Sequence, residues 1–202
     1  MVNTMDNKKS KKIKKILKNS SVGIAGVGGL GSNVAVSLAR AGVGCLLLVD
    51  FDKVEKSNLN RQYFFSDQIG LKKVKAIEDI IKNIDKEIDI KTFDYKLDED
   101  NCDKVFSYVD VIVEALDSAE QKTSFIENIM NKLPEKPVVG CSGVSGYGNI
   151  SRIKYMNLGR LHMIYDDKAK DCQDDVLMAP RVALMANWQA NVVLEILLGE
   201  DK

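Results

Sequence analysis

Histidine and cysteine, two residue types that often bind metals or carry acid–base chemistry, are scarce in this sequence. It contains a single histidine, His162, and its four cysteines stand far apart with no C-x-x-C pair. Structural zinc sites are usually built from closely spaced cysteines and histidines. We therefore expect no zinc site, and we expect His162 to be a hydrogen-bonded strand residue rather than a metal ligand.

Net charge and long apolar runs are absent as well. The 29 basic and 29 acidic residues give a formal charge of +0, so no overall field draws the protein to nucleic acid or to an anionic membrane. No stretch approaches the ~20 apolar residues that a membrane-spanning helix needs. The lysine-rich start lacks the apolar segment of a secretory signal. We expect a cytoplasmic protein that binds neither nucleic acid nor membrane.

What the sequence does contain is a glycine-rich turn, Gly26-Val27-Gly28-Gly29-Leu30-Gly31. It follows an apolar run, opens into a helical pattern, and is followed nineteen residues after its last glycine by Asp50 at the end of a second apolar run. Glycines let the backbone approach a phosphate, the helix amino terminus attracts it, and the acid can accept ribose hydroxyls. A tight turn with glycines kept only for packing would not account for Asp50, so we predict a nucleotide site.

Apolar runs and helical patterns alternate along the rest of the chain. Strands are expected over 22–25, 45–49, 88–93, 109–115 and 137–141, helices over 8–18, 32–41, 71–83, 101–108, 119–132 and 181–198, and a hairpin over 149–155 and 160–165 around Asn157-Leu158-Gly159. The segments 51–70, 142–148 and 166–175 are expected to be irregular. This alternation predicts an α/β fold, a Rossmann-like, doubly wound, mostly parallel sheet with a late antiparallel hairpin. Ligands of such sheets bind outside the carboxyl ends of the strands.

The segment after Asp50 is unusually rich in groups that bind phosphate. Arg61 carries a planar fork suited to phosphate oxygens, and Lys73 lies in the first turn of a predicted helix, where its charge opposes the helix dipole unless it meets an anion. Asp117 ends a predicted buried strand at the same edge of the sheet. It can hold a hard cation or cap the following helix, and both roles can hold at once.

Four motifs in this order along the chain resemble those of a known family. They are the glycine turn with Ser32, Val49-Asp50-Phe51-Asp52, Asn58-Leu59-Asn60-Arg61-Gln62, and Gly70-Leu71-Lys72-Lys73. Together they resemble the ThiF/MoeB/ubiquitin-activating family of adenylyltransferases, and Met178-Ala179-Pro180-Arg181 with the helix after it is most similar to short ThiF-type proteins that act on sulfur carriers. The lysines and the apolar face within residues 8–18 predict a basic amphipathic helix, so residues 1–19 are assigned to an amino-terminal basic helix. The resemblance implies that residues 20–202 form an ATP-binding adenylyltransferase domain.

The resemblance also implies a set of site residues. Catalysis would rest on Arg61, Lys73 and Asp117, with Asp117 holding Mg²⁺. The cofactor-binding set would be Gly26, Gly28, Gly29, Gly31, Asp50, Asp52, Ser57, Asn58, Arg61, Lys73, Asp117 and Ser118. The implied cofactors are ATP and Mg²⁺.

Three departures from the family pattern stand out. Ser118 replaces the usual asparagine after the metal-binding aspartate. No arginine occurs in residues 1–39, so the contact that many members make from there to the neighbouring subunit's ATP is missing or passes to a lysine such as Lys14. Cys172 lies in an expected loop where a covalent sulfur link would be placed, although loop cysteines are mostly incidental.

The function implied is the ATP-dependent adenylation of the carboxyl terminus of a ubiquitin-like sulfur carrier protein ending in Gly-Gly, by a homodimer. The thiamine pathway, with a ThiS-like carrier, is the first expectation. A MoaD-like carrier or a non-protein carboxylate of the tRNA-modification type is the alternative. A more distant alternative is an NAD-dependent oxidoreductase, which the glycine turn and Asp50 fit equally well but which leaves Arg61 and Lys73 without a role.

Overall fold

One mixed sheet organises the molecule, seen in a computed structural model that describes residues 4–170 and 174–199. Its seven strands run in the order β3-β2-β1-β4-β5-β7-β6. The strands are β1 (Ser21–Ala25), β2 (Cys45–Val49), β3 (Asp89–Phe93), β4 (Val111–Glu114), β5 (Val138–Ser142), β6 (Lys154–Leu158) and β7 (Leu161–Tyr165). All neighbouring strands are parallel except β6 and β7. The prediction of a doubly wound, mostly parallel sheet with a late antiparallel pair is confirmed.

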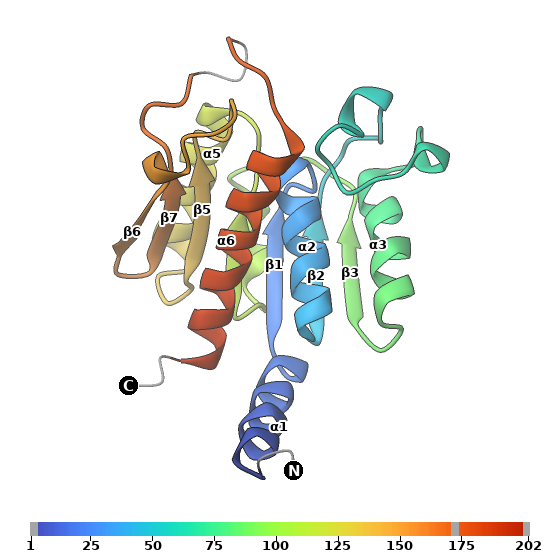
Figure 1. The fold of residues 1–202 in the computed structure, drawn as a ribbon, viewed down its shortest axis with the longest axis vertical. Helices are drawn as coiled ribbons and strands as arrows, with labels where there is room; N and C mark the ends of the chain where they lie inside the picture. The colour runs from blue at the N-terminus through green and yellow to red at the C-terminus, as the bar shows by residue number, and fades with distance from the viewer. Residues whose placement is uncertain (1–3, 171–173, 200–202) are drawn as a thin grey trace.

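Helices cover both faces of the sheet (Figure 1). They are α1 (Thr4–Lys18), α2 (Gly29–Ala41), α3 (Lys73–Ile84), α4 (Cys102–Phe106), α5 (Ala119–Lys132) and α6 (Ala179–Leu198), with short 3₁₀ turns at Lys56–Asn58, Ser66–Gln68 and Ile150–Arg152. The predicted bounds of the helices and parallel strands hold to within a few residues, α1 starting earlier than expected. No helix within residues 4–170 and 174–199 is long and apolar enough to cross a membrane.

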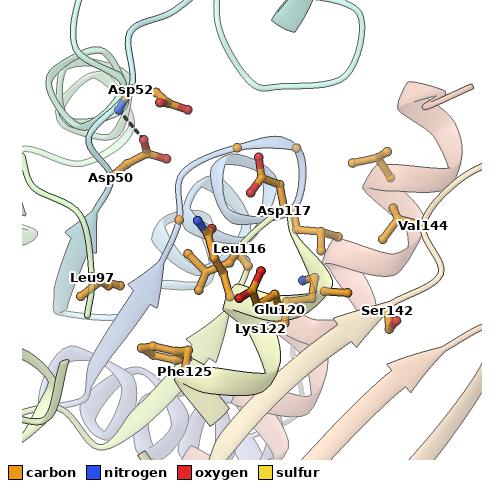
Figure 2. A pocket seen from close by; sticks show the side chains of 18 of the residues that line it. Asp50, Asp52, Leu97, Leu116, Asp117, Glu120, Lys122, Phe125, Ser142 and Val144 are labelled. Carbon is orange, nitrogen blue, oxygen red and sulfur yellow. Dashed lines mark hydrogen bonds between the residues drawn. The ribbon is translucent and has the colours of Figure 1, made fainter. Parts of the chain in front are cut away.

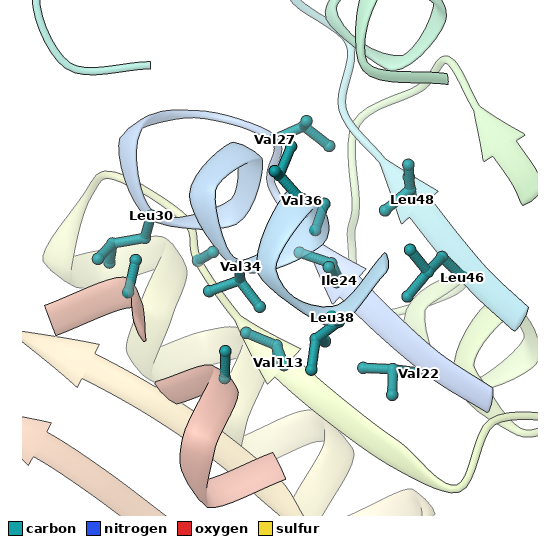
Figure 3. Packing of buried hydrophobic residues seen from close by; sticks show 14 of the residues in the cluster. Val22, Ile24, Val27, Leu30, Val34, Val36, Leu38, Leu46, Leu48 and Val113 are labelled. Carbon is teal, nitrogen blue, oxygen red and sulfur yellow. The ribbon is translucent and has the colours of Figure 1, made fainter. Parts of the chain in front are cut away.

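The core follows from strands that are apolar on both faces. β1, β2 and β4 are almost wholly buried, as parallel strands sandwiched between helices must be. Figure 3 shows Val34 and Leu38 of α2 packed against Ile24 of β1 and Val113 of β4. A smaller cluster on the other face gathers around Phe106 and Phe125, whose rings meet edge to face.

The basic amino-terminal helix α1 is anchored at its last turn. Leu17 is buried in the main core, while Lys14 is exposed. Figure 1 places α1 below the sheet, at the end opposite the carboxyl ends of the parallel strands. Lys14 therefore lies far from the nucleotide site of its own chain. The division at residue 19 into a helix and a domain stays a prediction.

The late hairpin is displaced from its predicted register. Residues 150–152 form a 3₁₀ turn, and the first strand runs from Lys154 to Leu158. It therefore includes Asn157 and Leu158, which the sequence places in the turn. The turn falls instead at Gly159 and Arg160, with φ +69° at Gly159. β6 is exposed along its whole length, so no buried face was there to reveal its register in the sequence.

Candidate functional site

A cleft of about 890 Å³ opens at the carboxyl ends of the parallel strands. The glycine turn after β1, the ends of β2 and β4, and the start of α3 form one wall. The end of β5, the segment after β7 and the start of α6 form the other. Figure 2 shows Asp50 and Asp52 on one side of this space and Ser142 and Val144 on the other. Every element here meets at one edge because the strands are parallel, as Rossmann-like sheets require.

The glycines of the turn divide between packing and lining. A Cβ at Gly31 would lie 1.9 Å from the carbonyl oxygen of Gly26, so Gly31 is required for the turn to close, and it does not line the cleft. Gly26 has φ +90°, and a Cβ there would lie 2.7 Å from the carbonyl oxygen of Ala115. Gly28 and Gly29 line the cleft, and at Gly28 the nearest atom to an added Cβ is 3.8 Å away. The backbone is therefore open to a ligand at Gly28.

Asp50 holds the glycine turn to the end of β2. Its Oδ2 accepts a hydrogen bond from the backbone N–H of Val27 at 2.7 Å, and its Oδ1 accepts one from the backbone N–H of Asp52 at 2.8 Å. Burial raises the pKa of Asp50 above its ordinary value, and the nearby charge of Lys73 offsets part of that rise. Each carboxylate oxygen keeps a lone pair for a ribose hydroxyl, as the predicted role needs.

Lys73 is a buried cation in the lining of the cleft. It is only 6% exposed, and its Nζ lies 2.7 Å from Oδ2 of Asp52. Its backbone N–H donates to the carbonyl oxygen of Asp52, which fixes the start of α3 against the end of β2. The carboxylate partner explains how the ammonium is tolerated at a helix amino terminus, where a lysine is otherwise unfavourable.

Arg61 and Gln62, in the segment after β2, both line the cleft. The Arg61 guanidinium donates to the carbonyl oxygen of Ser57 at 3.0 Å and to Oδ1 of Asn60 at 2.8 Å, both through Nη1. Gln62 is buried, and its Oε1 has no hydrogen-bond partner among the described residues. A buried amide with an unused acceptor beside Gly28 is a group available to a ligand.

Asp117 stands exposed at the end of β4, in the lining of the cleft. Its carboxylate makes no hydrogen bond or ion pair that the structure records with the described residues. Mg²⁺ in nucleotide sites is held by one or two carboxylates together with substrate phosphates and water, and an uncommitted carboxylate facing the glycine turn fits that pattern. The next residue, Ser118, caps α5 by accepting a hydrogen bond from the N–H of Gln121 at 3.1 Å, and it does not line the cleft.

Two further predicted residues serve the local fold instead of lining the cleft. Oδ1 of Asn58 accepts from the backbone N–H of Glu55 at 3.0 Å, which closes the 3₁₀ turn before Arg61. The hydroxyl of exposed Ser57 donates to the side chain of Glu55. The direct contacts to ATP proposed for Ser57, Asn58, Ser118 and Gly31 stay predictions, and Cys172 lies outside the described residues.

The opposite wall depends on a charge cluster that the sequence reading missed. Asp166, assigned to a charged loop, is only 4% exposed and pairs with Arg181 at 2.6 Å and Arg152 at 2.8 Å. Burial alone would raise the pKa of Asp166, but hydrogen bonds from Arg152, the Lys168 N–H and Arg181 lower it to about 2. Arg181 also donates to the carbonyl oxygens of Gly143 and Gly148. The cluster therefore joins the loop after β5 to the start of α6.

Two more charged residues, one at the end of β4 and one in α5, were not predicted. Glu114, the last residue of β4, has no exposed surface, and Lys122 of α5 lines the cleft and lies 2.9 Å from its Oε1. A charged residue ending an otherwise apolar strand was the available signal. The partner of Glu114 was not evident, since the sequence does not show which helix covers that face. By contrast, His162 behaves as predicted. Its Nδ1 shares a hydrogen bond with the Tyr155 hydroxyl at 2.6 Å, which confirms that it is a hydrogen-bonded strand residue.

Comparison with known proteins shows the family of this chain. The model of the ThiF family matches residues 3–202. The chain belongs to the ThiF family. Among curated ThiF-like relatives, it is 32% identical to the adenylyltransferase and sulfurtransferase MOCS3 of Dictyostelium discoideum, over 86% of this chain and 42% of that protein. It is 28% identical to the molybdopterin-synthase adenylyltransferase of Haemophilus influenzae, over 86% of this chain and 72% of that protein.

The chain spans less than half the length of several of these relatives, 40% in the adenylyltransferase and sulfurtransferase UBA4 of Candida glabrata. Among solved structures, the tRNA N6-threonylcarbamoyladenosine dehydratase TcdA of E. coli, in complex with ATP, superposes with a TM-score of 0.86. That match covers 95% of this chain and 91% of the other at 20% identity, so it supports the ThiF fold alone.

Proposed function

We propose that this ThiF-family protein adenylates the carboxyl-terminal carboxylate of a ubiquitin-like sulfur carrier protein, using ATP. The carboxylate attacks the α-phosphorus of ATP, the bond to the β-phosphate oxygen breaks, and pyrophosphate leaves. The products are an acyl adenylate and pyrophosphate. No nucleophile from the protein is needed, so catalysis consists of positioning and of electrostatic stabilisation.

The observation that carries this proposal is that Gly28, Asp50, Arg61, Lys73 and Asp117 all line a single cleft. Asp50 would hold the ribose, Arg61 and Lys73 would face the phosphates, and Asp117 would hold Mg²⁺. When bound, Mg²⁺ would neutralise negative charge on the phosphate oxygens. The names of the curated relatives, which are adenylyltransferases, support the same reaction class. In an NAD-dependent oxidoreductase, Arg61 and Lys73 would have no role.

The opposite wall is our candidate path for the carrier tail. The loop after β5 lines the cleft at Ser142 to Ser145, and the segment after β7 lines it at Asp166 and Asp167. A Gly-Gly tail has no side chains, so it can pass between these walls as an extended strand. We propose a ThiS-like carrier of the thiamine pathway as the partner, acting on a homodimer of this chain.

A second candidate partner has support of its own. The match to one relative covers most of that relative's length, and this relative is named molybdopterin-synthase adenylyltransferase. Its name favours a MoaD-like carrier. The carrier contact surface, not the ATP site, would separate the two pathways. The tRNA-modification alternative rests only on likeness of fold.

ATP–pyrophosphate exchange tests the proposal directly. The purified protein is incubated with ATP, Mg²⁺, labelled pyrophosphate and either a ThiS-like or a MoaD-like carrier, each with and without its terminal Gly-Gly. We expect label to enter ATP with one intact carrier and with neither truncated carrier. Exchange that ignores the carrier, or none with any intact carrier, would contradict the proposed function.

A further inference from the structure

We propose that Glu114 and Lys122 are positioning residues that hold the Asp117 carboxylate where it can bind Mg²⁺, an inference that rests on the ATP site of the proposed function. Neither residue lies in the motifs that carried the family resemblance. Their contacts show how the turn between β4 and α5 keeps its shape.

The Glu114 carboxylate organises the turn from inside. Its Oε1 accepts the backbone N–H of Leu116 at 2.7 Å and the ammonium of Lys122 at 2.9 Å. The first bond ties the residue before Asp117 to the end of β4. The second ties the same oxygen to α5, one turn beyond the Ser118 cap. Figure 2 shows Leu116, Asp117 and Lys122 together in the wall of the cleft.

The backbone around Glu114 is held from the other face of the sheet as well. Nε2 of Gln189, a fully buried residue of α6, donates to the carbonyl oxygen of Glu114 at 3.0 Å and to that of Val139 at 3.2 Å. The N–H of Ala115 donates to the carbonyl oxygen of Ala25 at 2.9 Å. With the strand end fixed on both sides, the side chain of Glu114 decides the direction in which the chain leaves toward Asp117.

An ion pair in this place is more than packing requires. Glu114 has no exposed surface, and its Oε2 faces the buried backbone of Gly140 and Cys141 instead of water. Burying a carboxylate costs free energy that an apolar side chain would not, and replacing buried ion pairs by apolar residues is often neutral or stabilising. What the carboxylate provides is a strong, charge-assisted bond to the Leu116 N–H. Groups behind a metal ligand commonly set its affinity in this way.

Calorimetric titration of ATP at a series of Mg²⁺ concentrations, without any carrier, tests the inference. In Glu114→Gln and in Lys122→Met, we expect the Mg²⁺ concentration for half-maximal enhancement of ATP binding to rise about 10- to 100-fold, the usual effect of losing a group behind a metal ligand. ATP binding without Mg²⁺ should be unchanged. Lys122→Arg, which keeps the charge, should stay close to wild type.

Two controls separate positioning from stability. Lys132→Met removes another paired lysine from the same helix, 3.4 Å from Asp103, and should leave the Mg²⁺ dependence unaltered. In an Asp117→Asn background, Glu114→Gln should produce no further shift, because the effect passes through Asp117. Melting temperatures identify any variant that does not fold. If Glu114→Gln does not fold, the comparison of Lys122→Met with Lys122→Arg decides whether the inference holds.

A wild-type Mg²⁺ dependence in folded Lys122→Met, or a full additional shift in the Asp117→Asn background, would overturn the inference. If the wild type binds ATP in a Mg²⁺-dependent way but shows no exchange with any carrier, the proposed function fails while the positioning role is still decided. If wild-type ATP binding does not respond to Mg²⁺, the positioning role is overturned together with the metal site.

Discussion

The buried carboxylate of Asp166 shows how a single residue sets both a wall of the cleft and a pH limit on the fold. Its pKa falls from an ordinary 3.8 to about 2 in the folded protein. A depressed folded pKa means that the stabilisation is fully present above pH ~4 and is lost as the pH falls toward 2. The difference corresponds to about 2 kcal/mol in the free energy of unfolding.

We expect Asp166→Asn to remove this acid-dependent loss, because the amide does not titrate. At neutral pH the same variant should be less stable than wild type by roughly 3–5 kcal/mol, since Arg181 loses a buried partner. Urea unfolding at pH 7 and at several pH values between 4 and 2 measures both effects. Parallel acid sensitivity in the two proteins would show that Asp166 is not the group responsible.

A second prediction at the scale of residues concerns the charged side chains proposed to bind ATP and Mg²⁺. Arg61→Ala, Lys73→Ala and Asp117→Ala should each lower carrier-dependent exchange by ~10²–10³-fold, the usual cost of removing one contact that stabilises transition-state charge. Lys75→Ala is the matched control, because Lys75 lies two residues along α3 in exposed ion pairs with Glu78 and Asp79. Near-normal exchange in all three variants would defeat the assignment.

At the scale of elements, two glycines of the turn between β1 and α2 are expected to differ in role, one supporting stability and the other ATP binding. Gly31→Ala should destabilise the protein by ~3 kcal/mol or more, because the new methyl group would meet a backbone oxygen at 1.9 Å. Gly28→Ala meets nothing closer than 3.8 Å, so it should unfold as wild type does while weakening ATP binding from within the cleft. Thermal unfolding and ATP titration of both variants test the division.

Gly42→Ala provides the control for this pair. Gly42 ends α2 with φ +94° and has open space around it, so an alanine there should cost only the ~1–2 kcal/mol of a left-handed residue and leave ATP binding intact. If Gly28→Ala destabilised the protein more than Gly31→Ala, the two glycines would have their roles reversed.

At the scale of the whole molecule, the position of α1 decides where Lys14 can act. The helix lies at the end of the sheet opposite the cleft, so Lys14 reaches an ATP site only if that site belongs to a second copy of the chain (Figure 1). If Lys14 replaces the arginine expected there, Lys14→Ala and Lys73→Ala should each lose exchange activity as separate proteins.

Mixed dimers of these two variants should then recover activity. Each mixed dimer holds one complete site, so an equal mixture should regain about a quarter of the wild-type rate if subunits exchange freely. Sedimentation of the wild type should show a dimer under the same conditions. No recovery in a mixture shown to contain mixed dimers would rule out a Lys14 contact across the interface.

The sequence by itself determined the sheet, the glycine turn and the acids at the strand ends. These features are local, because each ligand-facing residue of a parallel sheet sits at the end of its own strand, and the topology then brings the ends together. Asp50 and Asp117, which follow two of these strands, could therefore be assigned to one edge before the fold was known.

Only the tertiary structure decided the remaining features. It showed which glycines close the turn and which line the cleft, it fixed the register of the exposed hairpin, and it joined Asp166 to Arg181 and Glu114 to Lys122. These pairs depend on which side chains are buried against each other, and burial is a property of the packed layers. An exposed strand carries no alternation to fix its register, and a charged residue in a sequence does not show whether water or a buried partner will meet it.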